Sequence, residues 1–178
     1  MDAGRQIEHW FNHYEKDVFN YLVYYTGTRD VEDLVQDTFL RAIYAFDSFR
    51  SDANPKTWLI SIARNTAIDH YRKRNLWEKI KGTLIASQEE TNSNLTDHLY
   101  LRKEEHAHLY QSISRLKQSY REVVLLKGIA ELSAAEAANV LGWSVSKVNV
   151  TFHRAVKKLN EMMKEEMPNG TADRQRSS

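Results

Sequence analysis

The chain has 178 residues, of which 42% are hydrophobic, and a formal net charge of +1. A chain of this length and hydrophobic content can bury the core of one medium domain or of two small ones, and the hydrophobic content excludes general disorder. Six glycines and two prolines are few for an all-β fold, which needs many turns, so the composition favours helices. There is no cysteine, no signal-peptide pattern and no apolar run long enough to span a bilayer, so we expect a cytoplasmic protein without disulfides.

The first predicted helix runs from about Ile7 to Tyr25, where large apolar side chains recur at spacings of three and four. A Thr-Gly-Thr-Arg break follows, and Asp30 is expected to cap the next helix through its carboxylate. The inner stripe of that second helix is expected to hold five apolar side chains: Val35, Phe39, Ala42, Ile43 and Phe46.

A polar loop at 47–54 leads to a third predicted helix over 56–74. Asn54 and Pro55 favour this start, because Asn caps a first turn and Pro is tolerated at its first position. The helix is expected to end in a basic cluster, which suits the negative end of the helix dipole: Arg72, Lys73 and Arg74.

The polar segment 82–97 contains little to bury and many side chains that compete for backbone hydrogen bonds. We predict a flexible linker there, between a first domain at 1–81 and a second at 98–167. Residues 168–178 are expected to form a disordered tail. The predicted architecture is therefore all-α, with two small helical domains.

The second domain contains a helix-turn-helix pattern. Ser133 and Glu136 have the spacing of a capping box, and Gly142 can end the short helix 134–141 in the left-handed conformation. Ser144 can then cap a second helix. In such a motif the second helix enters the major groove of DNA. The alternative is a generic helical hairpin with a solvated basic face.

Charge is unevenly distributed along the chain. Residues 30–52 carry six acids against two bases, residues 64–81 carry six bases against two acids, and residues 144–158 carry four bases and no acid. This pattern predicts one contact to a basic protein surface and two to nucleic acid, although three solvated faces would look the same. The seven histidines form no recognisable ligand spacing, so no metal or other cofactor is expected.

Three stretches together resemble the sigma-70 family of bacterial transcription initiation factors, in its small extracytoplasmic-function (ECF) group. They are DVEDLVQDTFLRA at 30–42, FDSFRSDANPKTWLISIARNTAIDHYRKR at 46–74, and the segment 116–159 with the helix-turn-helix. They are similar to regions 2.2, 2.3–2.4 and 4 of that group, in the same order. The resemblance implies a dissociable RNA polymerase subunit that recognises and melts promoters and catalyses nothing itself.

The resemblance also implies which residues act. The acidic helix would bind the coiled coil of the polymerase β′ subunit through Glu32, Asp33, Gln36, Asp37 and Arg41. One non-template base of the −10 element would be flipped out and held in a pocket whose positions match Phe49, Asn65 and Asp69, with Arg64, Arg72 and Lys73 near the phosphates of the strand. The second domain would dock on the β flap and read the −35 element through Ser146, Lys147, Asn149, Val150, His153, Arg154 and Lys157.

Asn149 and Val150 depart from the group, where basic or small polar residues are frequent, so the −35 sequence does not follow from the resemblance. Members of the group are commonly inhibited by an anti-sigma factor, often membrane-anchored, and the same partner is expected here. The alternative function is a stand-alone helix-turn-helix regulator that binds duplex DNA. A small nucleic-acid-modifying enzyme has no catalytic constellation in the sequence to support it.

Overall fold

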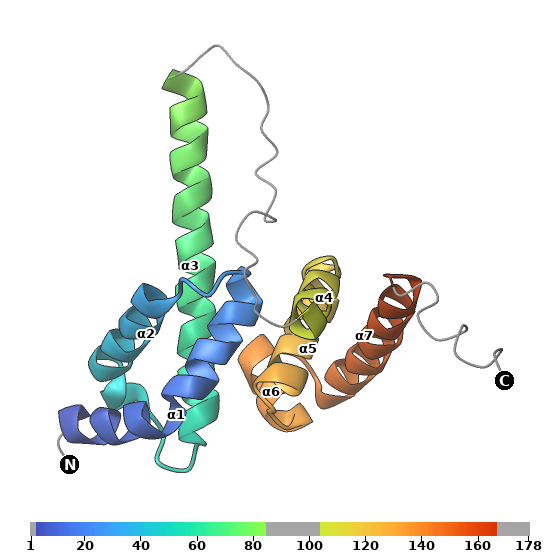
Figure 1. Cartoon of the computed structure of the whole chain (residues 1–178). Coiled ribbons are helices and arrows are strands. Elements are labelled where there is room, and N and C mark those ends of the chain that lie inside the picture. The colour runs from blue at the N-terminus through green and yellow to red at the C-terminus, as the bar shows by residue number, and fades with distance from the viewer. Residues whose placement is uncertain (1–2, 85–103, 167–178) are drawn as a thin grey trace, which may run out of the picture.

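The computed structural model describes residues 3–84 and 104–166, and within these ranges the regular elements are all helical (Figure 1). This agrees with the expected all-α class. No helix in the described ranges is long and apolar enough to cross a membrane. The predicted tail and residues 85–97 of the predicted linker lie outside the described residues.

The first domain consists of α1 (Ala3–Thr26), α2 (Glu32–Tyr44), a short 3₁₀ turn η1 (Phe46–Ser48) and α3 (Pro55–Leu84). The helices pack around the apolar faces that the sequence spacing predicts. The buried side chains of this core include Trp10, Val18, Leu22, Val35, Phe39, Leu59, Ile60 and Ala63.

The start and the inner stripe of α2 differ from the prediction. Asp30 does not cap the helix: Val31 is the N-cap residue, no side chain caps the first turn, and the Asp30 N–H donates to Thr28 Oγ1 at 3.1 Å. Val31 is only 1% exposed, so burial of this side chain fixes where the first turn begins. Ile43 is 40% exposed, because it lies about 100° around the helix from buried Ala42.

Asn54 begins α3 as predicted, since its Oδ1 accepts a hydrogen bond from the Lys56 N–H at 2.9 Å. The predicted end at Arg74 is wrong, because α3 is 30 residues long and runs to Leu84. No proline or glycine interrupts the sequence between Arg74 and Gly82, and an ion pair from Arg74 to Glu78 at 3.2 Å links successive turns. The end of α3 projects beyond the other helices (Figure 1).

The second domain consists of α4 (Glu104–Ser114), α5 (Gln118–Val124), a π-helical turn η2 (Leu125–Ile129), α6 (Ala134–Leu141) and α7 (Val145–Glu166). The helix-turn-helix prediction is correct in its local details: the capping box at the start of α6 has both of its hydrogen bonds, Gly142 has a φ of 66°, and Ser144 Oγ accepts from the Lys147 N–H at 3.2 Å.

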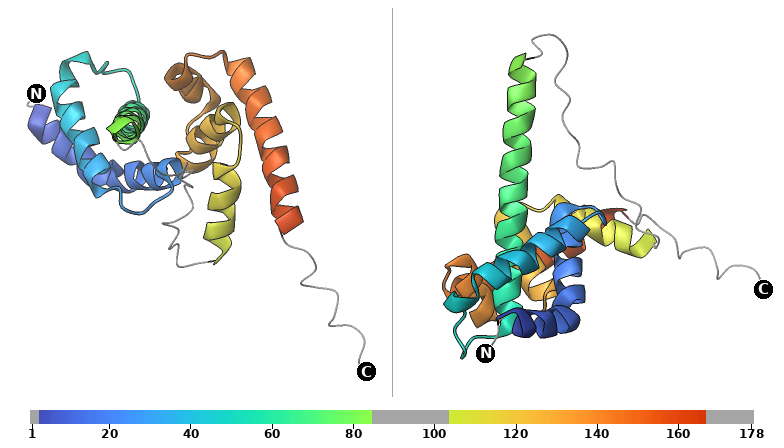
Figure 2. Two further views of the ribbon diagram at one scale, coloured as in Figure 1. Left: turned by 90° about the horizontal axis from the view of Figure 1, so that it is seen from above. Right: turned by 90° about the vertical axis from the view of Figure 1, so that its left-hand side faces the viewer.

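The two domains pack directly against one another, which the sequence did not predict. α1 contacts η2, α3 contacts α6, and one hydrophobic cluster runs through both domains. α7 lies on the side of the second domain that faces away from α1, α2 and α3 (Figures 1 and 2). The structure is therefore a closed arrangement with α7 at its outer edge.

Candidate protein and nucleic-acid interfaces

The acidic surface predicted on α2 is present, with Glu32, Asp33 and Gln36 exposed. Arg41 differs from them, because its guanidinium holds two carboxylates. Its Nε lies 3.0 Å from Asp37 Oδ2 and its Nη1 lies 2.8 Å from Asp69 Oδ2 on α3. The structure thus joins one predicted protein-contact residue to one predicted −10 residue. The hydrogen bond from Arg41 lowers the pKa of the Asp69 carboxyl, which stays ionised at neutral pH.

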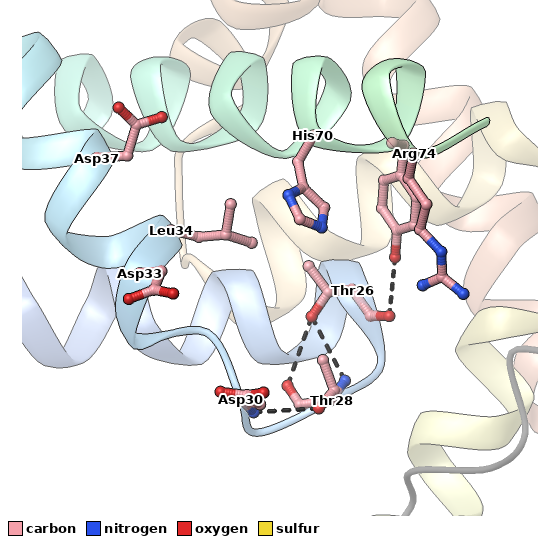
Figure 3. Close-up of a pocket in the computed structure, with 9 residues that line it drawn as sticks. Thr26, Thr28, Asp30, Asp33, Leu34, Asp37, His70 and Arg74 are labelled. Carbon is pink, nitrogen blue, oxygen red and sulfur yellow. Dashed lines mark hydrogen bonds between the residues drawn. The ribbon is translucent and has the colours of Figure 1, made fainter. Parts of the chain in front are cut away.

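A polar pocket of about 570 Å³ lies where α2, α3 and the turn after α1 meet (Figure 3). Asp30, Asp33 and Asp37 line it from the α2 side, and His70 and Arg74 line it from α3. Leu34 provides an apolar wall. A basic side chain of a protein partner would find three carboxylates at this position.

An apolar patch continues the acidic surface toward the end of α2, and the sequence analysis missed it. Leu40 is 52% exposed and Tyr44 is 87% exposed, beside the half-exposed Ile43. Positions 33, 37, 40 and 44 are three or four residues apart, so they share one face of the helix. That spacing could have revealed the patch. The face combines charges that orient a partner with apolar area that an interface core needs.

Phe49, predicted to hold a flipped base, is part of an aromatic cluster below the loop. Its ring is half-buried, with its centre 4.7 Å from that of Trp10 and 5.1 Å from that of Trp58. Both contacts are edge-on, which is a favourable geometry for aromatic rings. By contrast, Asn65, Arg72 and Lys73 are exposed on α3.

Arg64 on α3 does not face solvent but binds Glu122 of α5 in the second domain. Its Nε and Nη2 each lie 2.9 Å from one Glu122 carboxylate oxygen, a two-point geometry. The side chains are 20% and 6% exposed. Burial alone would lower the pKa of Arg64, but the hydrogen bonds and charge of Glu122 outweigh it and raise this pKa. Burial, and then the charge of Glu122, raise the pKa of the neighbouring Tyr21 hydroxyl.

Further polar contacts join the domains around this ion pair. Thr57 Oγ1 donates to Glu136 Oε1 at 2.7 Å, so the same glutamate that completes the capping box of α6 also binds α3. Partial burial would raise the pKa of the Glu136 carboxyl, but hydrogen bonds from Ser133, Thr57 and Asn54 outweigh it and lower this pKa. The Arg121 guanidinium lies over the Tyr25 ring, 5.5 Å from its centre.

The predicted −35 residues are brought together on the outer face of α7. All seven are exposed: Ser146, Lys147, Asn149, Val150, His153, Arg154 and Lys157. Val148, Ala155 and Leu159 are buried on the opposite face and fix the rotation of the helix. Lys147 lies over the Trp143 ring at 4.0 Å, and Lys127 Nζ donates to Asn149 Oδ1 at 3.3 Å.

Among the described residues, no cluster of three or more His, Cys, Asp and Glu side chains could hold a metal ion. The surfaces described above are an acidic and partly apolar face on α2, and exposed basic side chains on α3 and α7.

Two sequence families match the chain. The family described as sigma-70 region 2 matches residues 10–76, and the family described as sigma-70 region 4 matches residues 106–159. The chain is 35% identical to the RNA polymerase sigma factor YlaC of Bacillus subtilis over 92% of this chain and 95% of that protein. It is 31% identical to the ECF RNA polymerase sigma factor SigX of the same organism, over 88% and 84% respectively.

Two solved structures are similar over both domains. CnrH, solved in complex with the cytosolic domain of CnrY, is 26% identical with a TM-score of 0.68, over 92% of this chain and 91% of that one. The sigma factor RpoE of Bartonella quintana, solved with the anti-sigma factor NepR, is 23% identical with a TM-score of 0.71, over 92% and 99%. The latter likeness supports the fold.

Proposed function

The chain belongs to the sigma-70 family and is an RNA polymerase sigma factor of the ECF group, and we propose how its surfaces divide the work. In this proposal α2 binds core RNA polymerase, α3 and the loop before it bind and melt the −10 element, and α7 reads the −35 element.

The observation that carries the proposal is the surface of α7. Seven side chains, six of them polar, are exposed between Ser146 and Lys157 on its outward face, and residues 144–158 contain no acid. The capped helix α6 and the left-handed Gly142 hold α7 at a fixed angle. Asn, Arg and His can bond to base edges, and lysines suit phosphates. A helix of this composition after such a turn fits the major groove.

The face of α2 supports the polymerase contact. Asp33 and Asp37 offer negative charge, Leu40 and Tyr44 offer apolar area, and the pocket beside them can take a basic side chain. Complementary charge steers association, whereas the apolar part is desolvated on binding. The β′ coiled coil is the partner that the family resemblance implies for this helix, and the β flap is the one it implies for the second domain.

The −10 role is proposed for α3 because its basic residues follow one another along the helix. Extracting a base from the duplex costs a few kcal/mol, so the protein must hold both the base and the backbone. Arg72 and Lys73 are exposed for the backbone. Phe49 would contribute from the aromatic cluster, either by shaping the pocket that holds the flipped base or by lining it.

The stand-alone regulator is not favoured, because region 2 matches as well as region 4. An anti-sigma factor is proposed as a further partner, on the support of CnrH, which was solved with the cytosolic domain of CnrY. Membrane anchoring of that partner stays an expectation from the family, and so does a cytoplasmic location for this chain.

The decisive experiment is transcription in vitro. Core polymerase with and without the chain is supplied with sheared genomic DNA from the source organism, and the 5′ ends of the transcripts are sequenced. We expect new start sites that share two upstream elements at a constant spacing. Start sites that do not depend on the chain, together with unaided binding of duplex DNA by a dimer, would favour the stand-alone regulator.

A further inference from the structure

Arg64 has two candidate partners that differ in kind. The sequence assigns it to the phosphates of the melted strand, and the structure places it on the Glu122 carboxylate with two bonds of 2.9 Å. A guanidinium binds carboxylate and phosphate oxygens through the same two-point geometry. The Nε–Nη2 edge of the guanidinium, which holds Glu122, cannot hold a phosphate in the same two-point geometry at the same time.

Several contacts hold the second domain over Arg64. Glu122 is 4% exposed and the Arg64 side chain 20% exposed, so the edge of the guanidinium that holds the carboxylate faces the second domain and not solvent. Thr57 and Glu136 bond on one side of the ion pair, and Tyr110 of α4 contacts Gly27 on the turn after α1. Together with the packing of η2 against α1, the contact is thus spread over four elements of the second domain, α4, α5, η2 and α6.

We propose that Glu122 occupies on Arg64 the position that a backbone phosphate takes, so that the closed chain and the −10-bound chain exclude each other. This inference rests on the proposed function and adds its regulation: the second domain must leave α3 before the strand can bind there. The outward surface of α7 stays accessible in the closed arrangement, so the −35 reader is not covered in the same way.

A buried ion pair suits such an exchange. Its Coulomb attraction is largely offset by the cost of removing both charges from water, so exchanging one acidic partner for another changes the total little. Removing one partner is different, because it leaves an uncompensated buried charge that favours opening. The two ends of the pair can therefore be tested separately.

The test compares Glu122→Gln with Arg64→Gln. Both variants break the same ion pair and should separate the two domains. Only Glu122→Gln keeps the Arg64 guanidinium, which is then free to bind a phosphate. The probe is a fluorescent 15-nucleotide single strand of random sequence, titrated with the free full-length chain at several salt concentrations. Glu161→Gln on α7 is the matched control, since it removes one negative charge at an exposed position.

We expect Glu122→Gln to bind the strand about fivefold more tightly or better, with a salt slope steeper by about 0.7 for one added phosphate contact. Arg64→Gln is expected to show neither gain, and Glu161→Gln to stay within about twofold of the original chain. If Glu122→Gln and Arg64→Gln change the affinity alike, the inference is wrong.

A reversible cross-link covers the case in which these variants fold poorly. The chain has no cysteine, so Thr57→Cys with Glu136→Cys supplies the only two thiols, at a place where the domains touch. Joining them with a short reducible thiosulfonate linker locks the closed arrangement, and reduction releases it in the same molecule. We expect the lock to weaken strand binding about fivefold or more and reduction to restore it.

Failure of the proposed function has a different signature. Arg72→Gln with Lys73→Gln removes two exposed bases that the proposal places near the phosphates, about two turns further along α3 than Arg64. If this double variant binds the strand like the original chain, the assigned DNA face is wrong and the inference falls with it. If the double variant binds more weakly while the lock has no effect, the DNA face stands and the inference alone is overturned.

Discussion

The two proposed DNA faces of this chain differ in how much of each is exposed: three of the six predicted residues on α3 and its loop are exposed (Asn65, Arg72 and Lys73), whereas all seven on α7 are. On α3, Arg64 is bound to the second domain, Asp69 is bound to Arg41, and Phe49 is packed among aromatic rings. On α7, the seven predicted readers are exposed in one row. Both faces come from sequence segments of similar basic character, so charge alone did not distinguish them.

The difference shows what determines whether a helix face in a small helical protein is exposed or covered. None of the described helices packs over the outward side of α7, because α7 stands at the edge of the second domain (Figure 2). α3 is central and is covered on one side by α6. Arg64, on the side of α3 that the second domain covers, has an acidic partner within the chain, whereas Arg154 and Lys157, on the outward side of α7, are exposed.

The largest expected effect concerns the acidic face that adjoins α3. Asp33→Lys with Asp37→Lys should weaken binding to core polymerase about 100-fold, because four units of charge change where a basic partner is proposed to dock. Binding is measured by fluorescence anisotropy of the labelled chain at two salt concentrations. The matched control is Glu161→Lys with Glu165→Lys, which makes the same charge change on α7.

Asp37→Lys also removes one of the two carboxylates that Arg41 holds. Helical content by circular dichroism must therefore be unchanged in the double variant before its affinity is interpreted. Equal affinities for the α2 variant and the α7 control would remove α2 from the polymerase interface.

The next effect tests whether the exposed face of α7 reads sequence. Arg154→Ala should reduce transcription and flatten the penalty at one base of the −35 element, because a bidentate arginine discriminates a guanine by roughly 1 to 3 kcal/mol. Lys157→Ala should weaken all −35 sequences alike and reduce the salt dependence. Both are measured with single-base promoter variants in vitro. An even loss for Arg154→Ala across all promoters would mean that α7 enters the groove in a different rotation.

A smaller effect tests how much Phe49 contributes to the stability of the fold. Phe49→Ala should lower the free energy of unfolding by about 2 kcal/mol, because it leaves Trp10 and Trp58 without a half-buried ring partner. Tyr44→Ala is the control: this ring is 87% exposed, so its loss should change stability by less than about 0.5 kcal/mol. Chemical denaturation measures both. A Phe49→Ala protein with unchanged stability and impaired melting would make Phe49 a base-binding residue alone.

Local sequence signals predicted the local structure well. Ser133, Glu136, Gly142 and Ser144 all do what their side chains or backbone freedom suggest, because capping involves neighbours within a few residues. Asp30 is the instructive failure. Its carboxylate was suited to capping, but burial of Val31 set the helix start, and burial depends on residues distant in sequence.

The contacts between the domains could not be predicted in this way. Arg64 and Glu122 are 58 positions apart, and Thr57 and Glu136 are 79 positions apart. No sequence pattern indicates that residues at such separations are in contact. The end of α3 was also missed, because a basic cluster is compatible with a helix end without requiring one. The sequence therefore predicted candidate residues for two DNA faces, but it did not predict which of them are exposed and which are bound within the chain.

The smallest expected effect is a difference between two glycines, one in each domain. Gly27 has a φ of 89° and Gly142 a φ of 66°, so alanine is strained at both. Among the described residues no atom lies within 4 Å of a Cβ built at Gly142, whereas at Gly27 a Cβ would meet the Tyr110 hydroxyl of the second domain. Gly27→Ala should therefore cost about 1 kcal/mol more than Gly142→Ala, which corresponds to a melting temperature about 2 to 4 °C lower.

Tyr110→Phe separates the crowding from the backbone strain, because it removes the hydroxyl that the new Cβ would meet. In that background the extra cost of Gly27→Ala should shrink, while the cost of Gly142→Ala should stay the same, as expected for residues without a shared contact. Thermal unfolding of the six proteins completes the double-mutant cycle. If Tyr110→Phe relieves neither substitution, the turn after α1 does not bear on the second domain in solution, and the closed arrangement loses its contact at α4.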